Sequence, residues 1–120
     1  MTAKEQVQEF YQLNGPLNKS LMEQFIHDEI IFNWHSSKGF LQLDKQDLKA
    51  LATELGKSYV ASRIEISHIL EENNVVSVNY THYVSPIENP NEEMILAHFM
   101  VICELKENQL YRVYQMSQLT

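Results

Sequence analysis

The sequence contains few of the residues that mark specialised protein classes. Its 120 residues include one cysteine, three glycines and three prolines. The single Cys103 excludes an internal disulfide framework, and so little glycine and proline excludes collagen-like or low-complexity sequence. No apolar run approaches the roughly 20 residues that a membrane-spanning helix needs. Glycine-rich phosphate loops, Gly-x-Ser-x-Gly elbows and Cys-x-x-Cys pairs are also missing.

Basic residues are scarce as well. Nine Lys and Arg against sixteen Asp and Glu give a formal net charge of -7. This balance disfavours a nucleic-acid partner, because phosphates are neutralised by clusters of Lys and Arg. No basic-then-apolar signal segment follows Met1. We therefore expect a cytoplasmic protein without a nucleic-acid or membrane partner.

What remains is ordinary globular composition, with 44% hydrophobic and 21% charged residues. A chain of this length buries roughly two-thirds of its unfolded surface, which allows one core without metal or disulfides. We expect a single domain over residues 1–120, with no cofactor.

Three segments in the first half have helical spacing. Thr2 and Glu5 form a capping-box pattern before an amphipathic stretch over 3–13. A second short apolar stripe predicts a helix over about 17–26, and a third helix is expected to begin at Asp44.

The other segments are rich in β-branched and aromatic residues and alternate with period two. They predict strands over about 29–35, from 61 to a turn at 71–74, from 76 to a loop at 86–93, over 94–105, and over 110–119. Residues 36–43, with Gly39, are expected to form a loop. Strands joined by short turns pair antiparallel, so the fold class is α+β, with three helices on one face of a strongly curved, mostly antiparallel sheet.

This order of elements resembles the nuclear transport factor 2-like superfamily, also called SnoaL-like or ketosteroid-isomerase-like. The resemblance is carried by Val7–Tyr11, by Phe25–Trp34, and by the terminal hairpin from His98 to Ser117. It implies a cystatin-like cone whose helices and bent sheet enclose a pocket.

The residues that carry catalysis in ketosteroid isomerases do not match. Their tyrosine position falls at Phe10, the general-base aspartate falls near Asn33, and the second aspartate falls near Ala97. The Asp-Arg-Asp set of limonene-epoxide-hydrolase-like members is also missing. The resemblance therefore implies the fold without implying a reaction.

Five histidines are the most suggestive feature that remains: His27, His35, His68, His82 and His98. None has the spacing of a metal site, so we expect no bound metal. His82 is the best catalytic candidate, with Tyr80 beside it, because the resemblance places both on the pocket side. The pairing register decides whether His82 lies opposite Ala97 or His98, and sequence leaves this open.

Two functions follow as alternatives. In the first, the cone binds a small, largely apolar molecule in a pocket lined by Phe10, Asn33, Trp34, Tyr80, His82, Phe99 and Gln115. In the second, a lyase or isomerase acts on a small carbonyl or hydroxy compound, with His82 as base and Tyr80 or Tyr11 as hydrogen-bond donor. A protein-interaction domain is a third class, and it would leave an apolar patch exposed after dimerisation.

The strand over 94–105 is apolar on both faces, although helices can cover only one face of a sheet. A large exposed apolar patch is unusual in a monomer. We therefore expect a homodimer through the outer sheet face, centred on Leu96, His98, Met100, Tyr114 and Met116.

Overall fold

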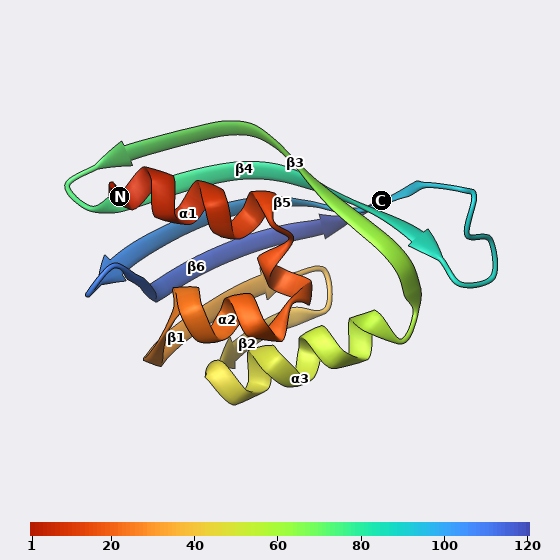
Figure 1. Cartoon of the computed structure of the whole chain (residues 1–120), viewed down its shortest axis with the longest axis horizontal. Helices are drawn as coiled ribbons and strands as arrows, with labels where there is room; N and C mark the ends of the chain where they lie inside the picture. Colours follow the sequence, from red (N-terminus) through yellow and green to blue (C-terminus); the bar gives the residue numbers. More distant parts are fainter.

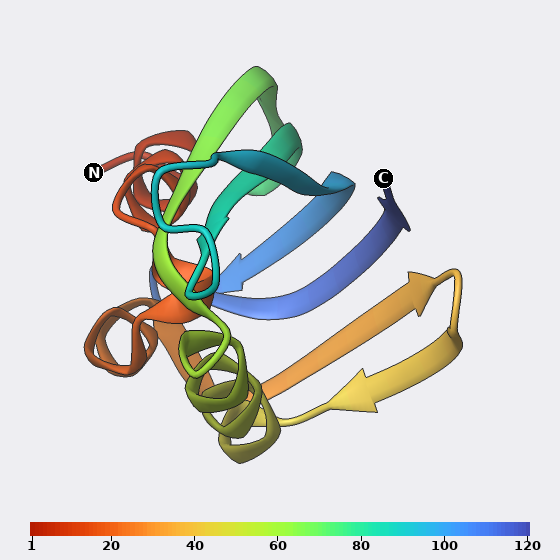
Figure 2. The same cartoon turned by 90° about the vertical axis from the view of Figure 1, so that its right-hand side faces the viewer.

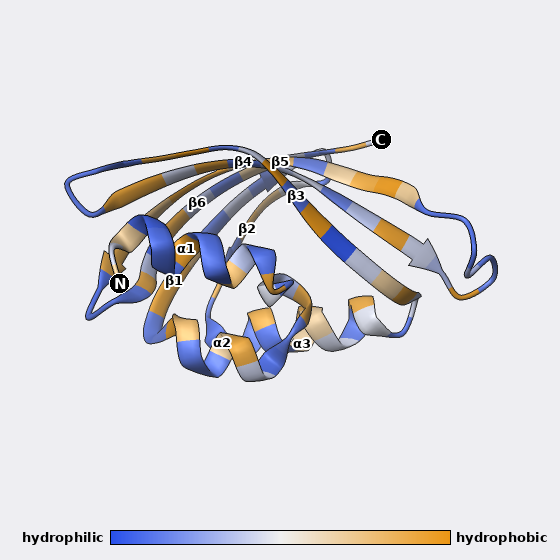
Figure 3. Ribbon diagram, turned by 45° about the horizontal axis from the view of Figure 1, so that its top comes forward, coloured by the Kyte–Doolittle hydropathy of each residue, from blue (hydrophilic) through white to orange (hydrophobic).

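The computed structural model describes all residues from Met1 to Thr120. Three α-helices and a 3-10 turn pack on one side of a six-stranded sheet, as Figures 1 and 3 show. The expected α+β cone is confirmed. The elements are α1 (Ala3–Gln12), the 3-10 turn η1 (Gly15–Leu17), α2 (Lys19–Phe25), β1 (Ile26–Ser36), β2 (Gly39–Leu43), α3 (Lys45–Gly56), β3 (Tyr59–Glu72), β4 (Val75–Pro86), β5 (Met94–Lys106) and β6 (Gln109–Leu119).

Capping residues set where the helices begin. At α1 the Thr2 side chain accepts from the Glu5 amide while Glu5 accepts from the Thr2 amide, so the expected capping box is present. Asp44 and Asp47 form a second such box at α3. The expected helix over 17–26 is divided, because Asn18 takes an extended conformation and caps α2.

The sheet has the order β2-β1-β6-β5-β4-β3. Neighbours along this order are antiparallel, except that β1 runs parallel to β6. That parallel pairing brings the N-terminal third of the chain against its last strand, and β1 then turns back into β2. Figure 2 shows the β1–β2 hairpin diverging from the main sheet.

The expected loop over residues 36–43 was wrong in part. Residues 39–43 form the edge strand β2, which pairs with β1 from Phe32↔Leu43 to Ser36↔Gly39. Gly39 has a φ of 112°, which glycine adopts without a steric cost, and this lets the chain reverse in two residues. β2 is mostly exposed, so its sequence lacks the half-buried alternation by which strands are recognised.

Alternate residues of β4 and β5 point into one interior. The inward set on β5 runs from Ala97 through Phe99 and Val101 to Cys103 and Leu105, all buried. These residues pack with apolar side chains of α1, α2 and β1 in one core. The sheet and the helices therefore share a single apolar interior.

The outer face of β5 and β6 keeps large apolar side chains in contact with solvent. Met100 is 54% exposed and Met116 is 63% exposed. Met100 lies directly opposite Met116, and Ile102 lies opposite Tyr114, so the four form a contiguous patch that we call the outer patch.

Leu96 does not belong to the outer patch, contrary to the expectation from sequence. His82 pairs with Ala97 and Tyr83 pairs with Ile95, so Leu96 is the extra residue of a β-bulge. A bulge reverses the alternation locally, and Leu96 packs against the core.

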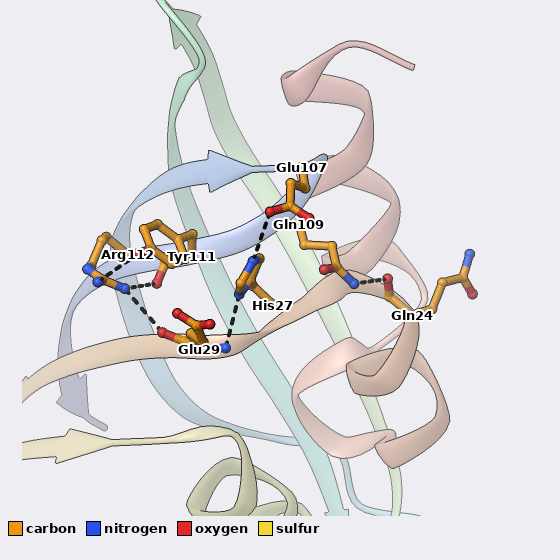
Figure 4. Close-up of polar contacts among 7 residues, drawn as sticks. All are labelled: Gln24, His27, Glu29, Glu107, Gln109, Tyr111 and Arg112. Carbon is orange, nitrogen blue, oxygen red and sulfur yellow. Dashed lines mark hydrogen bonds and ion pairs between the residues drawn. The ribbon is translucent and has the colours of Figure 1, made fainter.

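Polar contacts pin β1 to β6 at the end of the sheet where β1 begins, as Figure 4 shows. The His27 Nδ1 accepts from the Glu29 amide at 3.0 Å, and its Nε2 lies 3.6 Å from the Glu107 carboxylate. The Arg112 guanidinium donates to the Glu29 carbonyl at 3.2 Å and to the Tyr111 hydroxyl at 3.0 Å. We call this the closed end of the cone.

Gly15, at the start of η1, and Gly56, at the end of α3, provide a matched test of packing. A Cβ on Gly15 would lie 2.3 Å from the buried Phe10 ring, whereas a Cβ on Gly56 would meet nothing within 4 Å. We expect Gly15→Ala to lower the free energy of unfolding by about 1–3 kcal/mol through overpacking. Gly56→Ala should leave it unchanged or raise it by up to about 1 kcal/mol. Urea unfolding measures both, and equal stability of the two variants would contradict this packing.

Candidate functional site

A cavity of about 340 Å³ lies between the sheet and the helices and is partly open to solvent. Eighteen of its 25 lining residues are hydrophobic. The lining residues come from α1, η1, α2, α3 and every strand except β2, together with the turn between β1 and β2. The lining includes the exposed residues Ser37 and Lys38 in the turn between β1 and β2, and we call this the open end.

Six of the seven side chains expected in the pocket line this cavity. They are Phe10, Trp34, Tyr80, His82, Phe99 and Gln115. Asn33 does not, because successive residues of a strand point to opposite faces and Trp34 takes the inward position. The Asn33 amide instead donates to the Val113 carbonyl at 3.4 Å and accepts from Gln42 at 3.0 Å. Asn33 therefore contacts the neighbouring strands β6 and β2, and its expected place in the pocket is corrected.

His82 lies in an apolar part of the lining. Its strand neighbours are Ile64 on β3 and Ala97 on β5, and the Phe99 ring centroid is 6.4 Å away. Only 3% of the residue is exposed, and Nε2 is buried without a hydrogen-bond partner. Desolvation by burial lowers the pKa of His82 from 6.5 to about 4. The imidazole is therefore neutral at pH 7.

The register also separates His82 from His98, which sequence had left open. His82 faces the cavity, whereas His98 is exposed on the outer face and contacts the Thr81 hydroxyl through Nδ1 at 3.1 Å. No carboxylate lines the cavity to orient the His82 ring. A triad-like arrangement of acid, histidine and nucleophile is absent from this site.

Three further polar groups line the cavity on β1 and β6. The Trp34 Nε1 donates to the Ser117 hydroxyl oxygen at 2.8 Å, which leaves the Ser117 hydrogen free to donate elsewhere. Gln115 is buried and offers an amide that both donates and accepts. Gln115 was expected in the pocket, and Ser117, two residues further along β6, joins it in the lining.

Stacked aromatic rings form the wall towards the closed end. The centroid of the Tyr80 ring lies 4.7 Å from that of Phe99, in a parallel stack, and 4.8 Å from that of Tyr11. Burial raises the pKa of both Tyr80 and Tyr11, so both phenols keep their protons and can donate hydrogen bonds. Cys103 is fully buried, and burial raises the pKa of its thiol to about 12, so it is not a reactive thiolate.

The lining carries almost no charge. Lys38 is its one lysine, and no arginine, aspartate or glutamate belongs to it. No group of three or more His, Cys, Asp and Glu side chains is placed to hold a metal ion. The site is therefore suited to hydrogen bonding and apolar contact.

None of the three helices is long and apolar enough to cross a membrane.

Sequence reasoning missed the open end of the cavity. Ser36, Ser37 and Lys38 lie there, together with Leu55 near the end of α3. The only available signal was Gly39, which predicted a turn without showing what that turn faces. These positions are set by where the hairpin and α3 meet in space.

The low pKa of His82 predicts a specific dependence of stability on pH. Between pH 6.5 and about 4 the unfolded chain binds a proton at His82 that the folded chain does not. The free energy of unfolding should therefore fall as pH drops through this window, by up to roughly 3 kcal/mol from this group. His82→Gln should remove that part of the acid dependence, whereas His98→Gln on the outer face should keep it. Denaturant unfolding at pH 7.5, 6, 5 and 4 measures this, and identical acid dependence in wild type and His82→Gln would contradict it.

Comparison with known proteins gives similarity in structure alone. The sequence matches no family model and no curated protein sequence. Three solved structures share the fold at low sequence identity. IdmH from Streptomyces antibioticus, a proposed polyketide cyclase, has a TM-score of 0.77 at 6% identity, over 98% of this chain and 92% of its own. A proposed SnoaL-like polyketide cyclase from Jannaschia sp. CCS1 has a TM-score of 0.71 at 10% identity, over 96% and 84%. An NTF2-like protein of unknown function from Burkholderia pseudomallei K96243 has a TM-score of 0.70 at 11% identity, over 100% and 92%.

At such identities the likeness extends to the fold and not to the activity. It agrees with the resemblance carried by the first helix, the first strand and the terminal hairpin. The chain has the nuclear transport factor 2-like fold of the SnoaL-like proteins.

Proposed function

We propose that this chain is a single nuclear transport factor 2-like domain that binds a small, largely apolar molecule in its cavity. The observation that carries the proposal is a cavity of about 340 Å³ with a mostly apolar lining. Pockets that take drug-sized molecules begin at about 300 Å³ and combine apolar walls with a few polar groups. We retain the cytoplasm as the expected location.

The polar groups of the cavity suggest how a ligand is oriented. The neutral His82 ring, with its unpartnered nitrogen, lies on β4, and Gln115 lies on β6. An unpaired buried polar atom costs about 1–3 kcal/mol, which a hydroxyl or carbonyl group of a ligand can offset. Flat aromatic side chains such as Tyr80 and Phe99 favour a ring or chain lying against them.

The single tryptophan makes binding directly measurable. Trp34 lines the cavity, so its fluorescence should change when the cavity is occupied. The neutral dye N-phenyl-1-naphthylamine should bind with micromolar affinity and accept energy from Trp34. Ala97→Leu adds bulk beside His82 and should weaken dye binding at least tenfold, whereas His98→Leu on the outer face should not. Absence of dye binding to wild type, or equal binding to both variants, would count against the cavity as a binding site.

A second candidate is a lyase or isomerase that uses general acid–base catalysis. It is favoured by a neutral His82 near Tyr80 in the lining, and solved structures of the same fold include proposed polyketide cyclases. A histidine with a pKa of about 4 is a weak base at pH 7, and no carboxylate in the lining strengthens it. We therefore place binding first, and turnover of a bound carbonyl compound that is lost in His82→Gln would reverse the order.

We also propose that two copies associate through the outer patch. Met100, Ile102, Tyr114 and Met116 combine apolar area with the Met and aromatic content typical of interface centres. Leaving them exposed in a monomer would be unusual.

Met100→Asp tests this association, because it would place an unpaired carboxylate at the centre of the patch. We expect wild type to be a dimer by light scattering at micromolar concentration and Met100→Asp to be a monomer. Leu13→Asp, which changes an exposed apolar residue at the end of α1 on the helical side, should stay dimeric. A monomeric wild type would refute the proposal.

A further inference from the structure

The charges around the cavity are distributed unevenly. The chain has sixteen acidic residues and nine basic residues, yet the lining includes none of the acids and one of the bases, Lys38. None of the seven ion pairs in the chain involves Lys38. The cavity of this acidic protein therefore presents one uncompensated positive charge.

Lys38 lies at one end of the cavity. It lies in the two-residue turn between β1 and β2, at the open end and opposite the closed end. The Lys38 amide donates to the Ser36 hydroxyl oxygen at 3.1 Å, and that hydroxyl donates to the Gly39 carbonyl at 3.4 Å. These bonds order the backbone of the turn from which the exposed Lys38 side chain projects.

We propose that the cavity selects carboxylic acids with an apolar body, bound with the body inside the cone and the carboxylate beside Lys38. This inference rests on the proposed binding function and names the ligand class. A carboxylate at the open end keeps most of its hydration and lies near a cation. The free-energy cost of its desolvation is therefore small. The same group deep in the cavity would lose its hydration to a mostly apolar lining whose hydrogen-bond donors are all neutral, and burying a charge there without a cation is very costly.

The same charges disfavour other head groups. An alcohol or ester gains little from Lys38, and a protonated amine is repelled by it. An exposed ion pair of this kind is worth at most about 1 kcal/mol, or roughly fivefold in affinity. We therefore expect a modest preference that depends on salt, because exposed charges are screened within about 8 Å at physiological ionic strength.

Competition with N-phenyl-1-naphthylamine tests the inference with decanoic acid, decan-1-ol and decylamine, which share one chain length. We expect wild type at pH 7.4 and low salt to bind decanoate about fivefold more tightly than decanol, and decylamine most weakly. Lys38→Gln should abolish the preference, read as the ratio of decanoate to decanol affinity within each variant, and Lys38→Arg should retain it. Lys4→Gln is the control, because it makes the same change in net charge at the start of α1, outside the lining.

The outcomes separate the two proposals. If the dye and decanol bind but decanoate has no advantage, or keeps its advantage in Lys38→Gln, the preference for acids is refuted and the binding function stands. Failure of the dye and all three decyl compounds to bind wild type overturns the binding function, and the inference with it. Loss of the preference in 0.5 M NaCl, together with its loss in Lys38→Gln, would support a direct charge contact.

Discussion

The alternation of side chains along β4, β5 and β6 is the constraint on which both the interior and the exterior of this protein depend. Inward positions are mostly apolar, and the exceptions, His82, Gln115 and Ser117, contribute polar groups to the cavity. Outward positions of a solvated sheet face are normally polar, and the exceptions there form the outer patch. The polar side chains that point inward therefore lie in the cavity, and the apolar side chains that point outward form the outer patch. These are the two surfaces to which we assign a role.

The cavity lies between one face of an open, curved sheet, whose edges are β2 and β3, and the helices that cover it. β1 joins β6 in parallel, and β2 then carries the hairpin away from the strands that follow. The closed end is held by the His27 and Arg112 contacts of Figure 4, while the other end stays open beside Lys38. Apolar walls and a neutral His82 suit recognition of an apolar body better than proton transfer, which needs a group that titrates near neutral pH.

Much of the fold could be predicted because local patterns report it directly. The capping pair of Thr2 and Glu5, the helical stripe after Asp44 and the alternation of the long strands all correspond to observed elements. β2 was missed because an exposed edge strand has no buried face to produce a pattern. Leu96 was placed on the wrong face because a bulge shifts the alternation by one residue, and a bulge depends on the partner strand.

Sequence alone determined the class of the fold and the chemical character of the interior, since hydrophobic periodicity and residue type are local properties of the chain. Six of the seven side chains that it placed in the pocket do line the cavity, among 25 lining residues in all. Only the tertiary structure decided that His82 faces Ala97 rather than His98, that Asn33 lies outside the cavity, and that Lys38 stands at its opening. Each of these depends on register or on the meeting of distant segments, and a shift of one residue in register moves every side chain of a strand to the opposite face.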